Sequence, residues 1–126
     1  MKKINQDITT AKDIDILVDA FYKKLTNQPQ MAPFFHTIDL AHHLPRIKQF
    51  WRFALLNEAG YTTNVFEKHA HLPLDKIHFD IWVQLFCETV DEYFHGDTAS
   101  EAKLRARSLG FTFATKMEHI RKQSNE

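Results

Sequence analysis

Apolar residues recur along this chain at spacings of three and four, the repeat of an α-helix with one buried face. The first such stretch begins at Thr10 and ends at Asn27. Its apolar positions are Ile14, Leu17, Val18, Phe21 and Leu25. Tyr22 lies on the same face as two of them. This stretch therefore predicts a helix with one polar aromatic group on its inner side.

A second stretch predicts a helix that begins near His42 or His43. Pro45 is tolerated best in a first turn, where its missing N–H is not needed, and this sets the expected start. Gly60 is expected to end the helix, since glycine is common just beyond a helix C-terminus. The apolar positions are Ile47, Phe50, Trp51, Ala54 and Leu55.

Two further stretches with helical spacing of apolar residues lie in the second half of the chain. Asp75 is a good N-cap for a helix that Gly96 is expected to end. Its apolar positions are Ile77, Ile81, Trp82, Leu85, Phe86, Val90 and Phe94. Thr98 and Glu101 then have the spacing of a capping box, which predicts the start of a last helix. That helix carries Leu104, Leu109, Phe113, Met117 and Ile120.

Two short segments separate these helices. Residues 31–35 are an apolar connection containing Pro33, and one of its two phenylalanines is expected to reach the core. Residues 64–73 predict a helix of about two turns, capped by Asn64 and stopped by Pro73. A helix this short needs tertiary contacts. The expected fold is all-α, with one domain over residues 1–126 and fraying at 1–10 and 121–126.

Composition and charge exclude several classes of protein. Sixteen basic residues balance sixteen acidic ones without long runs of one sign, so no nucleic-acid or anionic-membrane surface is expected. The single Cys87 cannot form an internal disulfide, which is typical of a reducing compartment. The first residues have no apolar signal core and no apolar run could span a membrane, so we expect a soluble cytoplasmic protein.

Four residues are candidates for chemistry, and each also has a simpler explanation. His69 lies in the short helix, where it either ligates a metal or is an ordinary histidine. Tyr22 either contacts a ligand or keeps its hydroxyl in water, and Trp82 either serves a ligand or is a core residue. His43 can share one side of its helix with Arg46, or it is simply a polar residue at a helix start.

The helices could pack on themselves as a bundle without a cofactor. A large flat cofactor would, however, explain both the aromatic residues in neighbouring segments and the histidine on so short a helix. The chain resembles the truncated haemoglobins of the third group from about Leu17 to Met117. The motifs that carry this resemblance are Ala20-Phe21-Tyr22, Ala32-Pro33-Phe34-Phe35, His43 followed by Ile47 and Phe50-Trp51, His69-Ala70-His71-Leu72-Pro73, and Ile81-Trp82.

This resemblance implies a helical sandwich around haem b, with His69 as the proximal ligand of the iron. It implies that Tyr22, His43 and Trp82 lie on the opposite, distal face of the haem. The residues expected to line the haem site are Phe35, His43, Ile47, Phe50, Phe66, Leu72 and Trp82. Arg46 is expected to bind a haem propionate, because a guanidinium can clamp a carboxylate. Pro45, close to His43, departs from the family's pattern and can loosen the start of the distal helix.

The ligands implied are dioxygen, nitric oxide, carbon monoxide and peroxide. Hydroxyl and indole N–H donors stabilise negative charge on a bound ligand, so we expect redox chemistry, as in a nitric oxide dioxygenase or a peroxidase. The electrons are expected to come from an unidentified reductase. The alternatives are oxygen storage and gas sensing. A non-haem metal site using His42, His43, His69 and His71 is a further alternative. It is disfavoured because residues two apart on a helix point to different sides.

Overall fold

The structure, a computed structural model, describes residues 6–36, 39–58 and 74–124. Within these ranges it contains four α-helices and one short 3-10 helix, and no strand. The helices are α1 (Ala11–Asn27), η1 (Ala32–Phe35), α2 (Leu40–Leu56), α4 (Lys76–Tyr93) and α5 (Asp97–Ser124). The expected all-α fold is confirmed.

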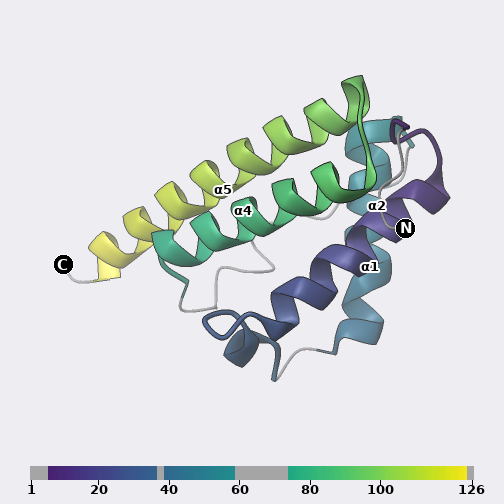
Figure 1. The fold of residues 1–126 in the computed structure, drawn as a ribbon. Helices are drawn as coiled ribbons and strands as arrows, with labels where there is room; N and C mark the ends of the chain where they lie inside the picture. Colours follow the sequence, from purple (N-terminus) through teal and green to yellow (C-terminus); the bar gives the residue numbers. More distant parts are fainter. Residues whose placement is uncertain (1–5, 37–38, 59–73, 125–126) are drawn as a thin grey trace.

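The helices form two pairs that meet at one core (Figure 1). α4 and α5 run antiparallel as a long hairpin, and α1 packs against both α2 and α4. No helix in the described part of the chain is long and apolar enough to cross a membrane.

The predicted helix α1 is confirmed at both ends. The Thr10 hydroxyl accepts a hydrogen bond from the backbone N–H of Asp13 at 3.2 Å, and the Asp13 carboxylate accepts one from the N–H of Thr10 at 3.0 Å. This reciprocal pair is a capping box, which satisfies N–H groups that the first helical turn leaves without partners. All five predicted apolar positions of α1 are buried.

The predicted start and end of α2 were wrong. The helix begins at Leu40, because the Asp39 side chain accepts a hydrogen bond from the N–H of His42. Pro45 therefore lies in the second turn, where it cannot donate to the carbonyl four residues earlier. The helix ends at Leu56, followed by Asn57 in the left-handed conformation at φ 61°. The expected terminator, Gly60, lies outside the described residues.

The predicted cap of α5 was also wrong. Asp7, far away in sequence, accepts hydrogen bonds from the backbone N–H groups of Thr98 and Ala99, each at 2.8 Å. Gly96, at φ 146°, allows this approach, since a Cβ there would lie 2.5 Å from the Asp7 carboxyl carbon. The start of α5 is thus stabilised by the segment before α1, and not by Thr98 in a local capping box.

The inner face of α5 carries small residues. Ala99, Ala102 and Ala106 are buried, and a Cβ on Gly110 would lie 2.5 Å from Val83 of α4. The predicted core residue Leu104 lies on the opposite side of α5 and is 63% exposed, and Ile120, near the C-terminal end of the helix, is 39% exposed. On α4 the prediction for Ile77 was similarly wrong, because that side chain is exposed and the neighbouring Phe79 is buried.

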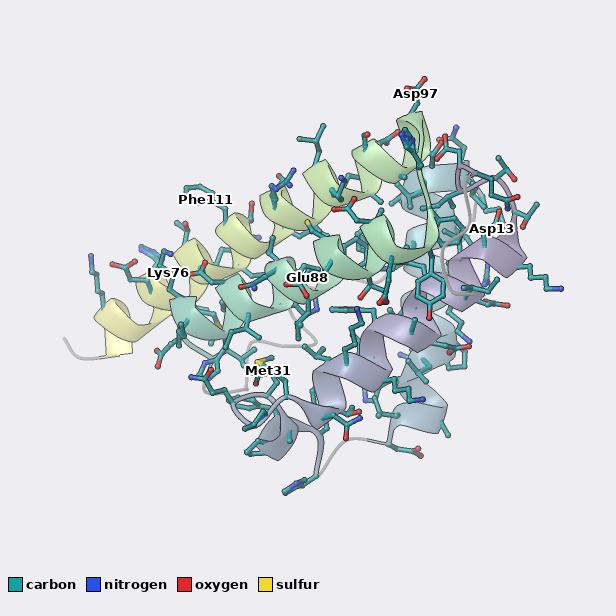
Figure 2. All side chains as sticks on the ribbon, in the orientation of Figure 1. Asp13, Met31, Lys76, Glu88, Asp97 and Phe111 are labelled. Carbon is teal, nitrogen blue, oxygen red and sulfur yellow. The ribbon has the colours of Figure 1, made fainter. Side chains whose placement is uncertain are left out.

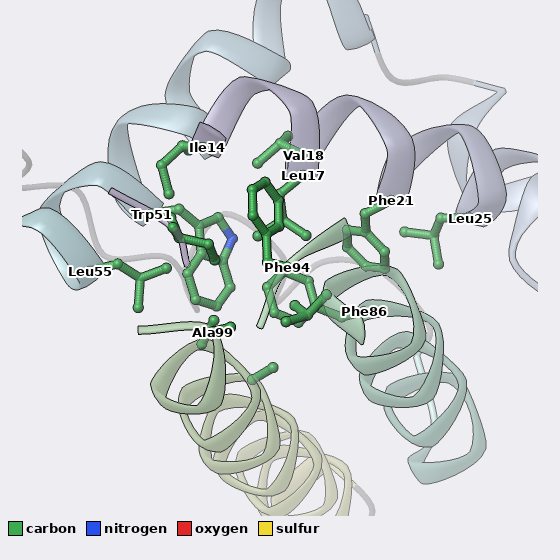
Figure 3. Packing of buried hydrophobic residues seen from close by; sticks show 14 of the residues in the cluster. Ile14, Leu17, Val18, Phe21, Leu25, Trp51, Leu55, Phe86, Phe94 and Ala99 are labelled. Atoms are coloured by element: carbon green, nitrogen blue, oxygen red, sulfur yellow. The ribbon is translucent and has the colours of Figure 1, made fainter. Parts of the chain in front are cut away.

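Aromatic rings form the centre of the core (Figure 3). Phe21 of α1 and Phe86 of α4 are fully buried, and their rings meet edge to face at 5.2 Å. Trp51 of α2 stacks on Phe86 at 4.7 Å, with an angle of 18° between the rings. These three residues connect the three helices that surround the candidate site.

Asp7 should stabilise the fold in a pH-dependent way. Burial raises the pKa of Asp7, but the N–H groups of Thr98, Ala99 and Ile8 more than offset this and lower it below 3.8. The stabilisation is therefore complete above pH 3.8 and is lost as the pH falls through the lowered pKa.

We expect Asp7→Ala to lower the free energy of unfolding by about 1–2 kcal/mol at pH 7, and by less near pH 3. Urea unfolding followed by circular dichroism measures this difference. Asp97→Ala is the matched control, because it removes a carboxylate from the first turn of the same helix. Equal losses in the two variants would refute a specific cap by Asp7.

Candidate functional site

Tyr22, Trp82 and Phe35 lie together at the junction of α1, α4 and η1. The Tyr22 ring meets Phe35 edge to face at 6.0 Å. The buried Phe21 ring contacts both polar aromatic residues, Tyr22 at 5.1 Å and Trp82 at 5.7 Å. All three site residues are half-buried and pack against the main core. The structure therefore brings together three of the residues that the sequence assigned to one site.

Tyr22 and Trp82 form a hydrogen-bonded pair. Burial raises the pKa of the Tyr22 hydroxyl far above its ordinary value of 10, and a hydrogen bond from the Trp82 side chain partly offsets this shift. Since an indole N–H can only donate, the hydroxyl oxygen of Tyr22 is the acceptor. Tyr22 consequently stays neutral, and its own O–H remains a donor.

A stack of rings fixes the position of Trp82. The Trp82 ring lies 5.8 Å from Phe86 at an angle of 15°, and Phe86 stacks in turn on Trp51. Such offset stacks are favourable beyond the apolar area that they bury. The apolar pattern of the sequence indicated only core positions for Phe21 and Phe86, although their rings pack against Tyr22 and Trp82. The one available signal was the spacing of four residues between Trp82 and Phe86, which places both on one face of α4.

Helix α2 provides an apolar wall and a polar end. Ile47 and Phe50 are half-buried and pack against the main core. His43 is also half-buried, and its ring lies 6.0 Å from that of His42. Arg46 is exposed. Along α2, the half-buried His43 thus precedes the half-buried pair Ile47 and Phe50.

The remaining predicted residues, Phe66, His69 and Leu72, lie outside the described residues. The predicted short helix over residues 64–73 lies there too. Among the described residues, no group of three or more His, Cys, Asp or Glu side chains could hold a metal ion. His42 and His43 are described, whereas His69 and His71, the other members of the alternative non-haem site, are not.

The described residues can do limited but specific chemistry. Half-buried aromatic and aliphatic side chains suit a flat apolar molecule, and a neutral hydroxyl donor such as that of Tyr22 suits a small ligand that develops negative charge. The donor set and the apolar wall therefore fit the distal side of a haem.

Comparisons with known proteins agree with this picture. No protein-family model matches the chain. The sequence is 26% identical over 104 residues to the group 3 truncated hemoglobin ctb of Campylobacter jejuni, covering 77% of this chain and 82% of that protein. The Campylobacter jejuni group III truncated hemoglobin crystal structure superposes with a TM-score of 0.82 at 24% identity, covering 90% of this chain and 95% of the other.

A second solved structure is less similar. Chlamydomonas reinhardtii THB4 superposes with a TM-score of 0.60 at 26% identity, covering 81% of this chain and 83% of the other. The helical arrangement and the sequence relationship agree. The resemblance to the group III truncated haemoglobins that the motifs predicted is therefore confirmed, and the chain has the truncated haemoglobin fold.

Proposed function

We propose that this chain is a haem protein that binds dioxygen and other small diatomic ligands. The observation that carries the proposal is the grouping of Tyr22, Trp82 and Phe35 around the Phe21 ring, at the edge of an aromatic wall. The sequence relationship to a protein named as a truncated hemoglobin supports the cofactor. Two apolar rings would be enough to fill the core at these positions. Polar aromatic groups are useful there if a small electron-rich ligand binds beside them.

Haem b is the proposed cofactor, and the residues on both sides of it come from different elements. We propose His69 as the proximal iron ligand, with Phe66 and Leu72 beside it. Opposite them, Phe35, Ile47 and Phe50 would pack on the porphyrin. Arg46, being exposed, is positioned to bind a propionate at a solvent edge.

When bound, haem supplies an iron that coordinates diatomic gases and exchanges electrons. The task of Tyr22 and Trp82 is to stabilise negative charge on a ligand, and they do so without being charged themselves. Trp82 donates to the Tyr22 oxygen, so it keeps the hydroxyl proton of Tyr22 directed away from the indole. In a site with little water such fixed donors act strongly, because the surroundings screen them weakly.

We propose redox chemistry on nitric oxide, oxygen or peroxide over oxygen transport. A Tyr22 hydroxyl held by Trp82 would slow ligand release and stabilise transition states in which the ligand gains charge. His43, near the start of α2, would donate a proton at near-neutral pH, which peroxide cleavage requires. Electrons would come from a separate reductase. Storage and sensing remain the alternatives that the experiments below distinguish.

We expect the purified chain to bind one haem b through His69. His69→Ala should abolish the five-coordinate ferrous imidazole spectrum, and added imidazole should restore it. His71→Ala is the matched control, because the two residues differ in direction on a helix. Absorption spectra of the ferric, ferrous and carbonyl forms provide the measurement. A normal spectrum in His69→Ala, or its loss in His71→Ala, would contradict the assignment.

Oxygen release should depend on both donors. We expect Tyr22→Phe and Trp82→Phe each to accelerate oxygen dissociation roughly tenfold, because the first removes a hydrogen bond to the ligand and the second removes the indole that orients the Tyr22 hydroxyl. The double variant should release oxygen more slowly than the product of the two single effects predicts, because the residues form one network. Stopped-flow kinetics measures these rates.

The same instrument decides between turnover and storage, with nitric oxide added to the oxygen-loaded protein and peroxide to the ferric protein. Fast oxygen release in the wild-type chain, with neither reaction faster than in a plain storage globin, would favour storage. Unchanged oxygen release in all three variants would remove Tyr22 and Trp82 from the ligand site.

His43 should move between solvent and the ligand because Pro45 weakens the turn that carries it. We expect Pro45→Ala to restore a backbone donor, to stiffen this turn and to slow carbon monoxide binding. His43→Leu should change both the binding rate and the pH dependence of the ferric spectrum between about pH 5 and 9. Flash photolysis and pH titration measure these effects. Identical behaviour of His43→Leu and the wild-type chain would make His43 a bystander.

A further inference from the structure

The outer face of α5 carries large apolar side chains that nothing in the described chain covers. Leu104 is 63% exposed and Phe111 is 75% exposed. In Figure 2 the Phe111 side chain points away from α4 and from the rest of the molecule. Ser108 and Thr115, both exposed, complete the same face at alternating spacings of three and four residues. We define these four residues as the outer face of α5.

The spacing of this face is that of a helix-packing surface. Residues that repeat at three and four positions form one stripe along a helix, and the residues of the outer face lie opposite the buried alanines of α5. The short side chains of Ser108 and Thr115 allow a second helix to approach, while the large residues that alternate with them fill the space. A single exposed leucine is unremarkable, but an aligned stripe with this alternation favours a second helix as its partner.

Charges at the two ends of the face are arranged for self-pairing. Glu101 and Arg105 form an ion pair at 2.8 Å at the N-terminal end, and Glu118 and Lys122 form one at 3.4 Å at the C-terminal end. All four side chains are between about half and three-quarters exposed. Such intrahelical surface pairs contribute little by themselves, so they are free to pair again in an interface.

We propose that the outer face of α5 binds the same face of a second copy of this chain, with the two helices antiparallel. A two-fold axis between positions 111 and 112 places Ser108 opposite Thr115 of the second copy. It also places Glu101 opposite Lys122 of the second copy, and Arg105 opposite Glu118 of the second copy. Both ends of the interface are then complementary in charge, and the two phenylalanine rings meet at the axis.

The dimer should be weak. From Glu101 to Lys122 the interface extends about 32 Å along one helix, which places its area at the small end of specific protein interfaces. We therefore expect a dissociation constant on the order of 100 µM, which sedimentation equilibrium can measure on the full chain. None of the described residues assigned to the haem site lies on α5, so this inference is independent of the proposed function.

Charge exchange tests the pairing directly. Arg105→Glu places like charges together at both ends of the dimer and should raise the dissociation constant roughly tenfold or more. Adding Glu118→Arg restores complementarity and should return the constant to within about threefold of the wild-type value. Lys23→Glu, an equal charge change on the exposed side of α1, is the control and should have no effect.

The apolar part of the interface has its own test. Phe111→Ser should raise the dissociation constant roughly tenfold or more, because an aromatic residue at the centre is lost from both copies. Ile77→Ser, which removes a similarly exposed apolar side chain from α4, should leave it unchanged. Circular dichroism should show the same helicity in every variant, since the substituted side chains are exposed.

A disulfide checks the register. In a Cys87→Ser background, Ser108→Cys with Thr115→Cys should form a covalent dimer on oxidation. Ser100→Cys with Thr115→Cys, whose thiols would lie about 12 Å apart along the axis, should not. A chain that stays monomeric at about 1 mM overturns the proposal, even if the face binds a different protein. A dimer whose dissociation constant is unaffected by Arg105→Glu and Phe111→Ser also overturns it. Equal crosslinking of the two cysteine pairs would do the same.

Discussion

The stack of Trp82, Phe86 and Trp51 is the contact on which the candidate site depends. It crosses from α4 to α2, and Phe21 of α1 closes it from the side by meeting Phe86 edge to face. Because Trp51, Phe86 and Phe21 are almost completely buried, no ring in this group can turn without opening a cavity. The indole of Trp82 is thereby held against the Tyr22 hydroxyl, and a donor pair that acts on a ligand needs such rigidity.

The two ends of helix α2 differ in how tightly they are packed. Trp51 and Leu55, toward the C-terminal end of α2, are buried and anchor that end in the core. Its first two turns carry His43 and Pro45, and there the proline removes one backbone hydrogen bond. Movement of His43, as proposed above, therefore need not disturb the aromatic wall, because His43 and the buried Trp51 lie in different turns of one helix.

Helix α5 shows how packing on one side determines the surface on the other. Its buried face carries Ala99, Ala102, Ala106 and Gly110, which bring this part of α5 close to α4, and Met117 farther along. With the small residues turned inward, Leu104 and Phe111 necessarily turn outward, since helical geometry separates the two sets by half a turn. The same geometry therefore produces the tight hairpin and the exposed stripe that we propose as a dimer interface.

The sequence by itself determined the all-α class, the start of α1 at Thr10 and its buried stripe, the start of α4 at Asp75, and the resemblance to truncated haemoglobins that the fold confirms. These features depend on residues close together in the chain, which is where periodicity and capping rules apply. Tertiary structure alone decided the cap of α5, because Asp7 reaches it across 91 residues of sequence. It also decided which face of α5 is buried. A periodic pattern identifies apolar residues, but Leu104 lies outside because close approach to α4 favours alanine and glycine over larger side chains. The hydrogen bond between Tyr22 and Trp82 belongs to the same class, because only the packing of α1 on α4 brings the hydroxyl and the indole together.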